Sequence, residues 1–99
     1  MPSSQTALSE VELHALLLAS PEWALADGKL VREWKFKDFV AAIAFVNRVA
    51  ALAEQAQHHP DIDIRYNRVQ LALVSHDAGG ITARDARMAR QLTAEFPQP

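Results

Sequence analysis

The chain of 99 residues contains no cysteine, which excludes a disulfide framework and thiolate chemistry. No stretch approaches the roughly 20 apolar residues that span a bilayer, and the first ten residues lack the charged segment and apolar run of a secretion signal. Lysine and arginine do not cluster, and the net charge is -2, so there is no electrostatic footprint for nucleic acid or an anionic membrane. The sequence therefore predicts a cytoplasmic protein that binds neither nucleic acid nor membrane.

The composition is that of a folded domain. Apolar residues make up 49% of the chain and charged residues 22%, as is usual for globular proteins. The length predicts a single domain over residues 1–99. A domain of this size buries only about 60 to 65% of its unfolded-chain surface, so association would add stability that one small core cannot supply. We therefore expect a homodimer or homotetramer.

Two capping boxes mark helix starts. Ser9 and Glu12 have the spacing at which each side chain bonds the other residue's backbone amide, which predicts a helix over residues 10–19. Thr82 and Asp85 repeat this spacing and predict the start of the last helix. The residues of that helix expected to face inward are Ala86, Ala89 and Leu92.

Two hairpins are predicted from turn signals between alternating segments. The pair 27–28 is Asp-Gly, which tolerates the positive φ angles of a type I′ turn, and it divides the segment 22–36 into two strands. A second pair of strands is expected at 62–66 and 69–76, around a tight turn at 67–68. In the first hairpin, the residues expected on one face of the second strand are Leu30, Arg32, Trp34 and Phe36.

A long amphipathic helix is predicted between the hairpins. It begins at Asp38 and runs to about Gln57. Pro60 disfavours helical geometry at His59, so the helix should end near His58. The apolar residues that recur at three- and four-residue steps, and so are expected on its buried stripe, are Phe39, Ala42, Ile43, Val46, Val49, Ala50 and Ala53.

The order of elements is helix, strand, strand, helix, strand, strand, helix. The simplest packing of this order is a two-layer α+β fold, with one four-stranded, largely antiparallel sheet and the helices packed on one face. Such a sheet leaves edge strands open, which favours dimerisation by sheet extension.

Three of the four histidines fall at the ends of predicted elements. His58 and His59 follow the long helix, and His76 ends the last strand. Imidazole has an unperturbed pKa near neutrality, and element ends are where sites are usually built, so the three are candidates for acid and base chemistry. The alternative is that each is a surface or structural histidine, with His58 placed to interact with the helix dipole. Glu54, one turn before His58, is a candidate hydrogen-bond partner for it.

Other chemistries have weaker signals. Three histidines with Asp77 or Asp85 could supply zinc ligands, but adjacent histidines rarely aim at one ion, and no HxH or HExxH spacing occurs. Ser75 precedes His76 without the GxSxG context of a nucleophile. The pair 79–80 is Gly-Gly but matches no phosphate-binding loop.

Three residues also have structural interpretations. Asp85 is placed to cap the last helix, where a carboxylate suits the positive end of the dipole. Trp23 and Trp34 are more typical of core or interface aromatics than of ligand platforms.

Taken together, four motifs resemble those of the pterin-4a-carbinolamine dehydratases. They are W-K-F-K-D-F (residues 34–39), E-x-x-x-H-H-P (54–60), Y-N-x-V (66–69) and S-H-D-x-G-G-I-T-x-x-D (75–85). The resemblance covers residues 23–92. It implies a two-layer α/β fold, a homodimer or dimer of dimers, and no metal or cofactor.

The resemblance also implies an activity and a site. The reaction is loss of water from 4a-hydroxytetrahydrobiopterin to give quinonoid dihydropterin, which recycles the cofactor of aromatic amino-acid hydroxylases. His58 and His76 correspond to the acid and base histidines, and His59 to the second catalytic histidine in the pterin pocket. The further residues implied are Pro60, Ser75, Asp77, Ala78 and Trp23 as substrate contacts, with Glu54 and Asp85 in support.

Two departures from the family pattern stand out. Asp61 is followed by Ile62 where the family often has tryptophan, so one aromatic wall of the pocket is missing. Ser75 replaces the usual threonine and keeps its hydroxyl. Relatives of the family also act as dimeric binding partners, including a transcriptional coactivator role, and a binding module of this kind is the alternative. Such a module would not need the histidines, so their retention favours the enzyme.

Overall fold

The computed structural model describes residues 6–98. The predictions of a single domain over 1–99 and of no leader therefore fall partly on residues outside the described range. Helices and strands follow in the expected order, with one short 3₁₀ turn, η1, added before the last helix. The elements are α1 (Glu10–Ala19), β1 (Ala24–Ala26), β2 (Lys29–Lys35), α2 (Phe39–Ala56), β3 (Asp61–Arg65), β4 (Arg68–Leu73), η1 (His76–Ala78) and α3 (Ala83–Glu95).

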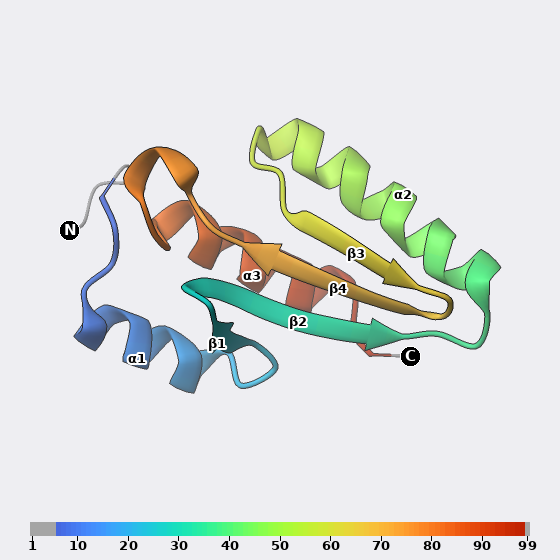
Figure 1. Cartoon of the computed structure of the whole chain (residues 1–99), viewed down its shortest axis with the longest axis horizontal. Coiled ribbons are helices and arrows are strands. Elements are labelled where there is room, and N and C mark those ends of the chain that lie inside the picture. Colours follow the sequence, from blue (N-terminus) through green and yellow to red (C-terminus); the bar gives the residue numbers. More distant parts are fainter. Residues whose placement is uncertain (1–5, 99) are drawn as a thin grey trace.

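The four strands form one sheet in the order β1-β2-β4-β3, and every neighbouring pair is antiparallel. Leu30 lies opposite Leu73 and Trp34 opposite Val69, and all four side chains are fully buried. Figure 1 shows α3 behind this sheet and α2 alongside β3. The core therefore lies between the sheet and the helices, and the predicted two-layer α+β fold is confirmed.

The predicted local signals are present. Ser9 and Glu12 bond each other's backbone amides at the start of α1, as a capping box requires. Asp27 and Gly28 both take positive φ, 52° and 75°, as a type I′ turn between β1 and β2 demands. Local chemistry thus decides where these elements begin and turn.

The second hairpin differs from the prediction by one residue, and β4 is shorter than expected. β3 ends at Arg65 because Tyr66 takes the left-handed conformation, with φ 52°. The Asn67 side-chain amide donates to the Phe36 carbonyl at 2.8 Å, which ties this turn to the chain after β2. At its other end β4 stops at Leu73, not at His76, because Ser75 bridges to Gly80 and the chain turns into η1.

The buried stripe of α2 also differs from the prediction. Phe39 is 49% exposed and Ala50 is exposed, whereas Phe45 packs against the rings of Trp34 and Phe96. Apolar residues surround this helix, so periodicity alone could not fix which side meets the sheet. The buried residues of α2 are Ala42, Phe45, Val49, Leu52 and Ala53.

The apolar character of α2 also corrects the expectation that no stretch approaches the length needed to span a bilayer. Among the described residues, α2 is one helix of 18 residues with mean hydropathy 1.3, long and apolar enough by those two criteria to cross a membrane. The core helix of a soluble protein meets the same criteria, and α2 buries a stripe against this sheet.

Candidate functional site

The end of α2 positions His58. Gln57 takes the left-handed conformation, with φ 53°, and closes the helix. The His58 backbone N–H still donates to the Ala53 carbonyl at 3.1 Å, so this residue is held against the last turn of α2. Pro60 then starts the extended chain that becomes β3. His58 is therefore fixed at a defined helix end instead of on a free loop.

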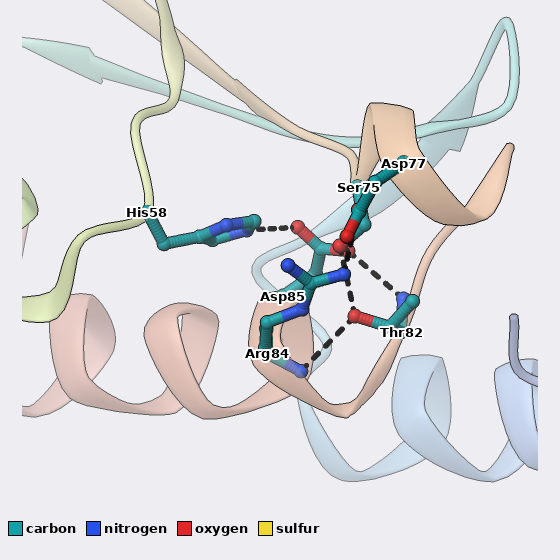
Figure 2. A network of polar contacts seen from close by, with 6 residues as sticks. All are labelled: His58, Ser75, Asp77, Thr82, Arg84 and Asp85. Carbon is teal, nitrogen blue, oxygen red and sulfur yellow. Dashed lines mark hydrogen bonds and ion pairs between the residues drawn. The ribbon is translucent and has the colours of Figure 1, made fainter. Parts of the chain in front are cut away.

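The His58 side chain meets a buried carboxylate from α3. Its Nε2 lies 2.5 Å from Asp85 Oδ1; the Asp85 side chain is fully buried, and that of His58 is 12% exposed. Figure 2 shows the imidazole pointing from the α2–β3 connection toward the start of α3. A buried charge requires partners, and this carboxylate has them.

Asp85 is also bonded from two other directions. Its Oδ2 accepts from the Ser75 hydroxyl at 2.8 Å and from the Thr82 backbone N–H at 2.9 Å. The Ser75 and Thr82 hydroxyls are 2.8 Å apart. The carboxylate therefore joins the end of α2, the chain after β4 and the start of α3 (Figure 2).

His76 lies one residue beyond this network. Ser75 is buried, whereas His76 begins η1 and is exposed. An ion pair between Asp77 Oδ1 and Arg84 Nη2, 2.7 Å long, ties η1 to the first turn of α3. The Arg84 hydrogen bond and charge hold the pKa of Asp77 below its ordinary value. An accessible imidazole is thus carried on a segment anchored on both sides.

The other predicted residues are placed differently. His59 is exposed, and its Nε2 contacts Glu54 Oε2 at 2.5 Å, so Glu54 partners His59 and not His58. Pro60 and Ala78 are half-buried beside His59 and Asp77. Trp23 is not brought to this cluster: it is 3% exposed, and its indole N–H donates to Thr93, two helical turns along α3 from Asp85. Its contact with substrate stays a prediction.

The cavities of the single chain are small at this site. A cavity of about 100 Å³ borders His58 and is lined also by Arg84 and Arg87. Ligand pockets usually measure about 300–1,000 Å³, so the isolated chain does not enclose a ring-sized ligand here. A larger apolar cavity of about 290 Å³ lies between α2 and the chain after α3, against Trp34 and Phe96, and no histidine lines it.

The described residues hold no group of three or more His, Cys, Asp or Glu side chains arranged to bind a metal ion. The zinc alternative raised by the three histidines therefore gains no support from residues 6–98. Asp85, one of the ligands considered for it, instead bonds His58.

The sequence did not predict that the Ser75 and Thr82 hydroxyls bond each other beside Asp85. The Thr82–Asp85 capping box forms as predicted, yet its carboxylate also bonds His58, so the capping role and the site role coincide. Ser75 was expected to contact substrate, but its hydroxyl bonds Thr82 and Asp85 inside the protein. No local sequence signal marks this contact, because Ser75 and Asp85 are ten residues apart and meet only once the chain turns through η1.

Comparison with known proteins gives consistent matches. The sequence profile of the family described as Pterin 4 alpha carbinolamine dehydratase matches residues 6–94. A protein of Acidobacterium capsulatum is 59% identical over 78 residues, which cover 79% of this chain and 85% of that one. One of Chloroflexus aurantiacus is 56% identical over 82 residues, covering 83% and 88%. Both carry the name "Putative pterin-4-alpha-carbinolamine dehydratase".

A solved structure supports the fold. The crystal structure of a transcriptional coactivator/pterin dehydratase from Brucella melitensis is 38% identical and superposes with a TM-score of 0.83. The match covers 90% of this chain and 97% of that one. Sequence and fold similarity therefore extend over almost the whole described chain.

Proposed function

The chain belongs to the pterin 4 alpha carbinolamine dehydratase family, and from this we propose that it removes water from 4a-hydroxytetrahydrobiopterin to give quinonoid dihydropterin. In this reaction the C4a–O bond breaks, the hydroxyl leaves as water with one added proton, and the ring N5–H loses a proton as the C4a–N5 double bond forms. One proton donor and one acceptor suffice, and the step needs no oxidant or reductant.

One observation carries the proposal: the His58 imidazole is bonded to a fully buried carboxylate. A histidine held in this way has one ring nitrogen fixed by the protein and the other left for chemistry. His76, exposed on the neighbouring η1 turn, supplies the second proton-transfer group. Each such group is typically worth about 10²- to 10⁴-fold in rate.

The deciding experiment is a turnover assay with chemically generated 4a-hydroxytetrahydrobiopterin. The wild-type protein should accelerate dehydration, and His58→Ala and His76→Ala should each lower kcat/KM by roughly 10²-fold or more. His14→Ala is the matched control, because His14 is an exposed histidine on α1. No acceleration by folded wild-type protein, or full activity in both single variants, would remove the proposal.

The proposal also covers the oligomeric state of the protein and the enzyme that it serves. We expect a homodimer or homotetramer that serves an aromatic amino-acid hydroxylase by returning its pterin cofactor to the cycle. The small size of the cavity at His58 in one chain supports an assembly around the site.

A second function has one specific observation in its favour. The Brucella melitensis protein is named as a transcriptional coactivator as well as a pterin dehydratase. A dimeric binding module of that kind would tolerate loss of His58 and His76, whereas the dehydratase would not. The assay above separates the two functions.

A further inference from the structure

In every hydrogen bond that the Asp85 side chain makes with its neighbours, the carboxylate is the acceptor. Its two oxygens face the Ser75 hydroxyl, the Thr82 backbone N–H and the His58 Nε2. An ionised carboxylate only accepts hydrogen bonds, so the proton in the 2.5 Å contact belongs to His58 Nε2.

The hydrogen bonds also determine where the Ser75 and Thr82 hydroxyl protons point. Ser75 has one hydroxyl proton, which it donates to Asp85 Oδ2, so Thr82 must be the donor in the 2.8 Å contact between the two hydroxyls. Thr82 Oγ1 in turn accepts from the Arg84 backbone N–H at 3.2 Å. Donation therefore runs from the first turn of α3 through Thr82 and Ser75 to the carboxylate (Figure 2).

Burial makes this arrangement rigid. Ser75 is 2% exposed, and Thr82 and Asp85 are fully buried, so water does not compete for their protons or lone pairs. In such surroundings a donor or acceptor left without a partner is costly, which selects the one proton arrangement that satisfies every group.

We propose that Ser75, Thr82 and Asp85 are positioning residues that fix His58 as its Nε2–H tautomer, so that every proton His58 exchanges with substrate passes through Nδ1. The Nδ1 atom makes no hydrogen bond to another residue in the range 6–98. The catalytic meaning of this assignment rests on the proposed dehydratase function, but the tautomer itself can be measured without substrate.

Asp85→Asn gives a sharp test, because the network dictates how the introduced amide must lie. Its oxygen has to face the two donors from Ser75 and Thr82, which leaves its NH₂ group facing His58 Nε2. His58 Nε2 must then accept, and the ring proton moves to Nδ1. The substitution keeps the shape of the side chain but inverts the tautomer, and a catalytic histidine in the wrong tautomer loses on the order of 10³-fold or more in kcat.

The experiment uses protein labelled with ¹⁵N at histidine, and NMR spectra recorded without substrate at a pH high enough for neutral rings. In the wild type, Nδ1 of His58 should give the signal of an unprotonated ring nitrogen, and in Asp85→Asn that signal should move to Nε2. Ser75→Ala leaves the Asp85 carboxylate as an acceptor, so the His58 tautomer should stay the same, while loss of one donor to that carboxylate should lower kcat/KM about tenfold. Ser75→Thr, which keeps the hydroxyl, should restore kcat/KM.

Asp38→Asn is the matched control, because Asp38 caps α2 by accepting from the Ala41 N–H and forms no hydrogen bond or ion pair with a histidine within residues 6–98. It should leave the His58 tautomer and kcat/KM unchanged. A purely structural role for Asp85 would lower Tm in Asp85→Asn without moving the His58 signals.

The outcomes separate this inference from the proposed function. A wild-type spectrum with the Nδ1–H tautomer overturns the inference at once, even if Asp85→Asn does not fold. An unchanged His58 tautomer in folded Asp85→Asn overturns it as well. The predicted spectra in a wild-type protein without turnover would instead uphold the tautomer and refute the dehydratase.

Discussion

The Trp34 indole Nε1–H donates to the Phe96 backbone carbonyl at 2.7 Å, inside the core and 62 residues along the chain. Trp34 lies in the core between the sheet and the helices, where its ring meets Trp23 edge to face and Phe45 at a tilt. Phe96 is the residue that closes α3. One side chain of β2 therefore holds the end of α3 on the sheet, and α3 carries Asp85 at its other end.

Trp34→Phe should destabilise the protein by about 1–3 kcal/mol, because the buried Phe96 carbonyl loses its donor. Urea unfolding followed by circular dichroism measures this change. Val40→Ala is the control, since Val40 is 75% exposed on α2, and its effect should stay within about 0.5 kcal/mol. Equal stability of the two variants would contradict the role assigned to this hydrogen bond.

Substitution of each of the three histidines should change the kinetic constants in a different way. His58→Ala and His76→Ala remove proton-transfer groups and should lower kcat. His59→Ala should chiefly raise KM, because His59 is exposed and within residues 6–98 bonds Glu54, not the buried Asp85 carboxylate. The double variant of His58 and His76 should lose much less than the product of the single losses, since acid and base act as one unit. Steady-state kinetics on folded variants decides this. Multiplicative losses would show that the two histidines act independently.

The ion pair between Asp77 and Arg84 should make η1 sensitive to acid. The folded-state pKa of Asp77 is lowered, so the pair adds stability above the ordinary aspartate value of about 4 and loses it as pH falls through the folded value. Hydrogen exchange at the Ala78 and Gly79 amides, whose bonds close η1, should show protection that declines below about pH 4. Asp77→Asn should have low protection at all pH values.

Glu33→Gln is the matched control for that experiment. Glu33 pairs with Arg68 at 3.7 Å across β2 and β4, away from η1. Its removal should leave the exchange of Ala78 and Gly79 unchanged. Protection that stays constant with pH in the wild type would show that the ion pair does not hold the turn.

Local signals predicted much of this fold. The capping boxes at Ser9 and Thr82 and the Asp27–Gly28 turn depend on neighbouring residues only, and each formed as expected. The face of β2 with Leu30 and Trp34 followed from strict alternation. Information that is local in sequence therefore sufficed for element type and order.

The remaining features depend on contacts between distant segments. Phe39 was expected on the buried stripe of α2, but the sheet meets the side of the helix that carries Phe45. For the site, motif resemblance named His58 and Asp85, but not that Ser75 and Thr82 direct their protons to the carboxylate. Such directions arise only once three segments are packed together.

The protein should self-associate through β3, which is an edge strand with Ile62 and Ile64 each 37% exposed. Antiparallel pairing of two copies centred on Asp63 would set Ile62 against Ile64 of the second copy. It would also set Asp61 against Arg65, an opposite-charge pair. Asp63 would face Asp63 of the second copy, and each Asp63 accepts from Arg65 of its own chain at 3.2 Å. Light scattering across a dilution series should show at least a dimer at micromolar concentration.

Ile64→Lys separates this edge from the other exposed apolar surface. It places a charge in the paired register and should shift the dilution curve toward monomer, because edge lysines oppose strand addition. Val40→Lys is the matched control on α2, where Val40 and Phe39 are exposed. Sheet extension predicts that only the Ile64 variant dissociates. A wild-type monomer at micromolar concentration, or dissociation by the Val40 variant alone, would refute pairing through β3, and the second result would place the interface on α2 because α2 is the helix that presents Val40.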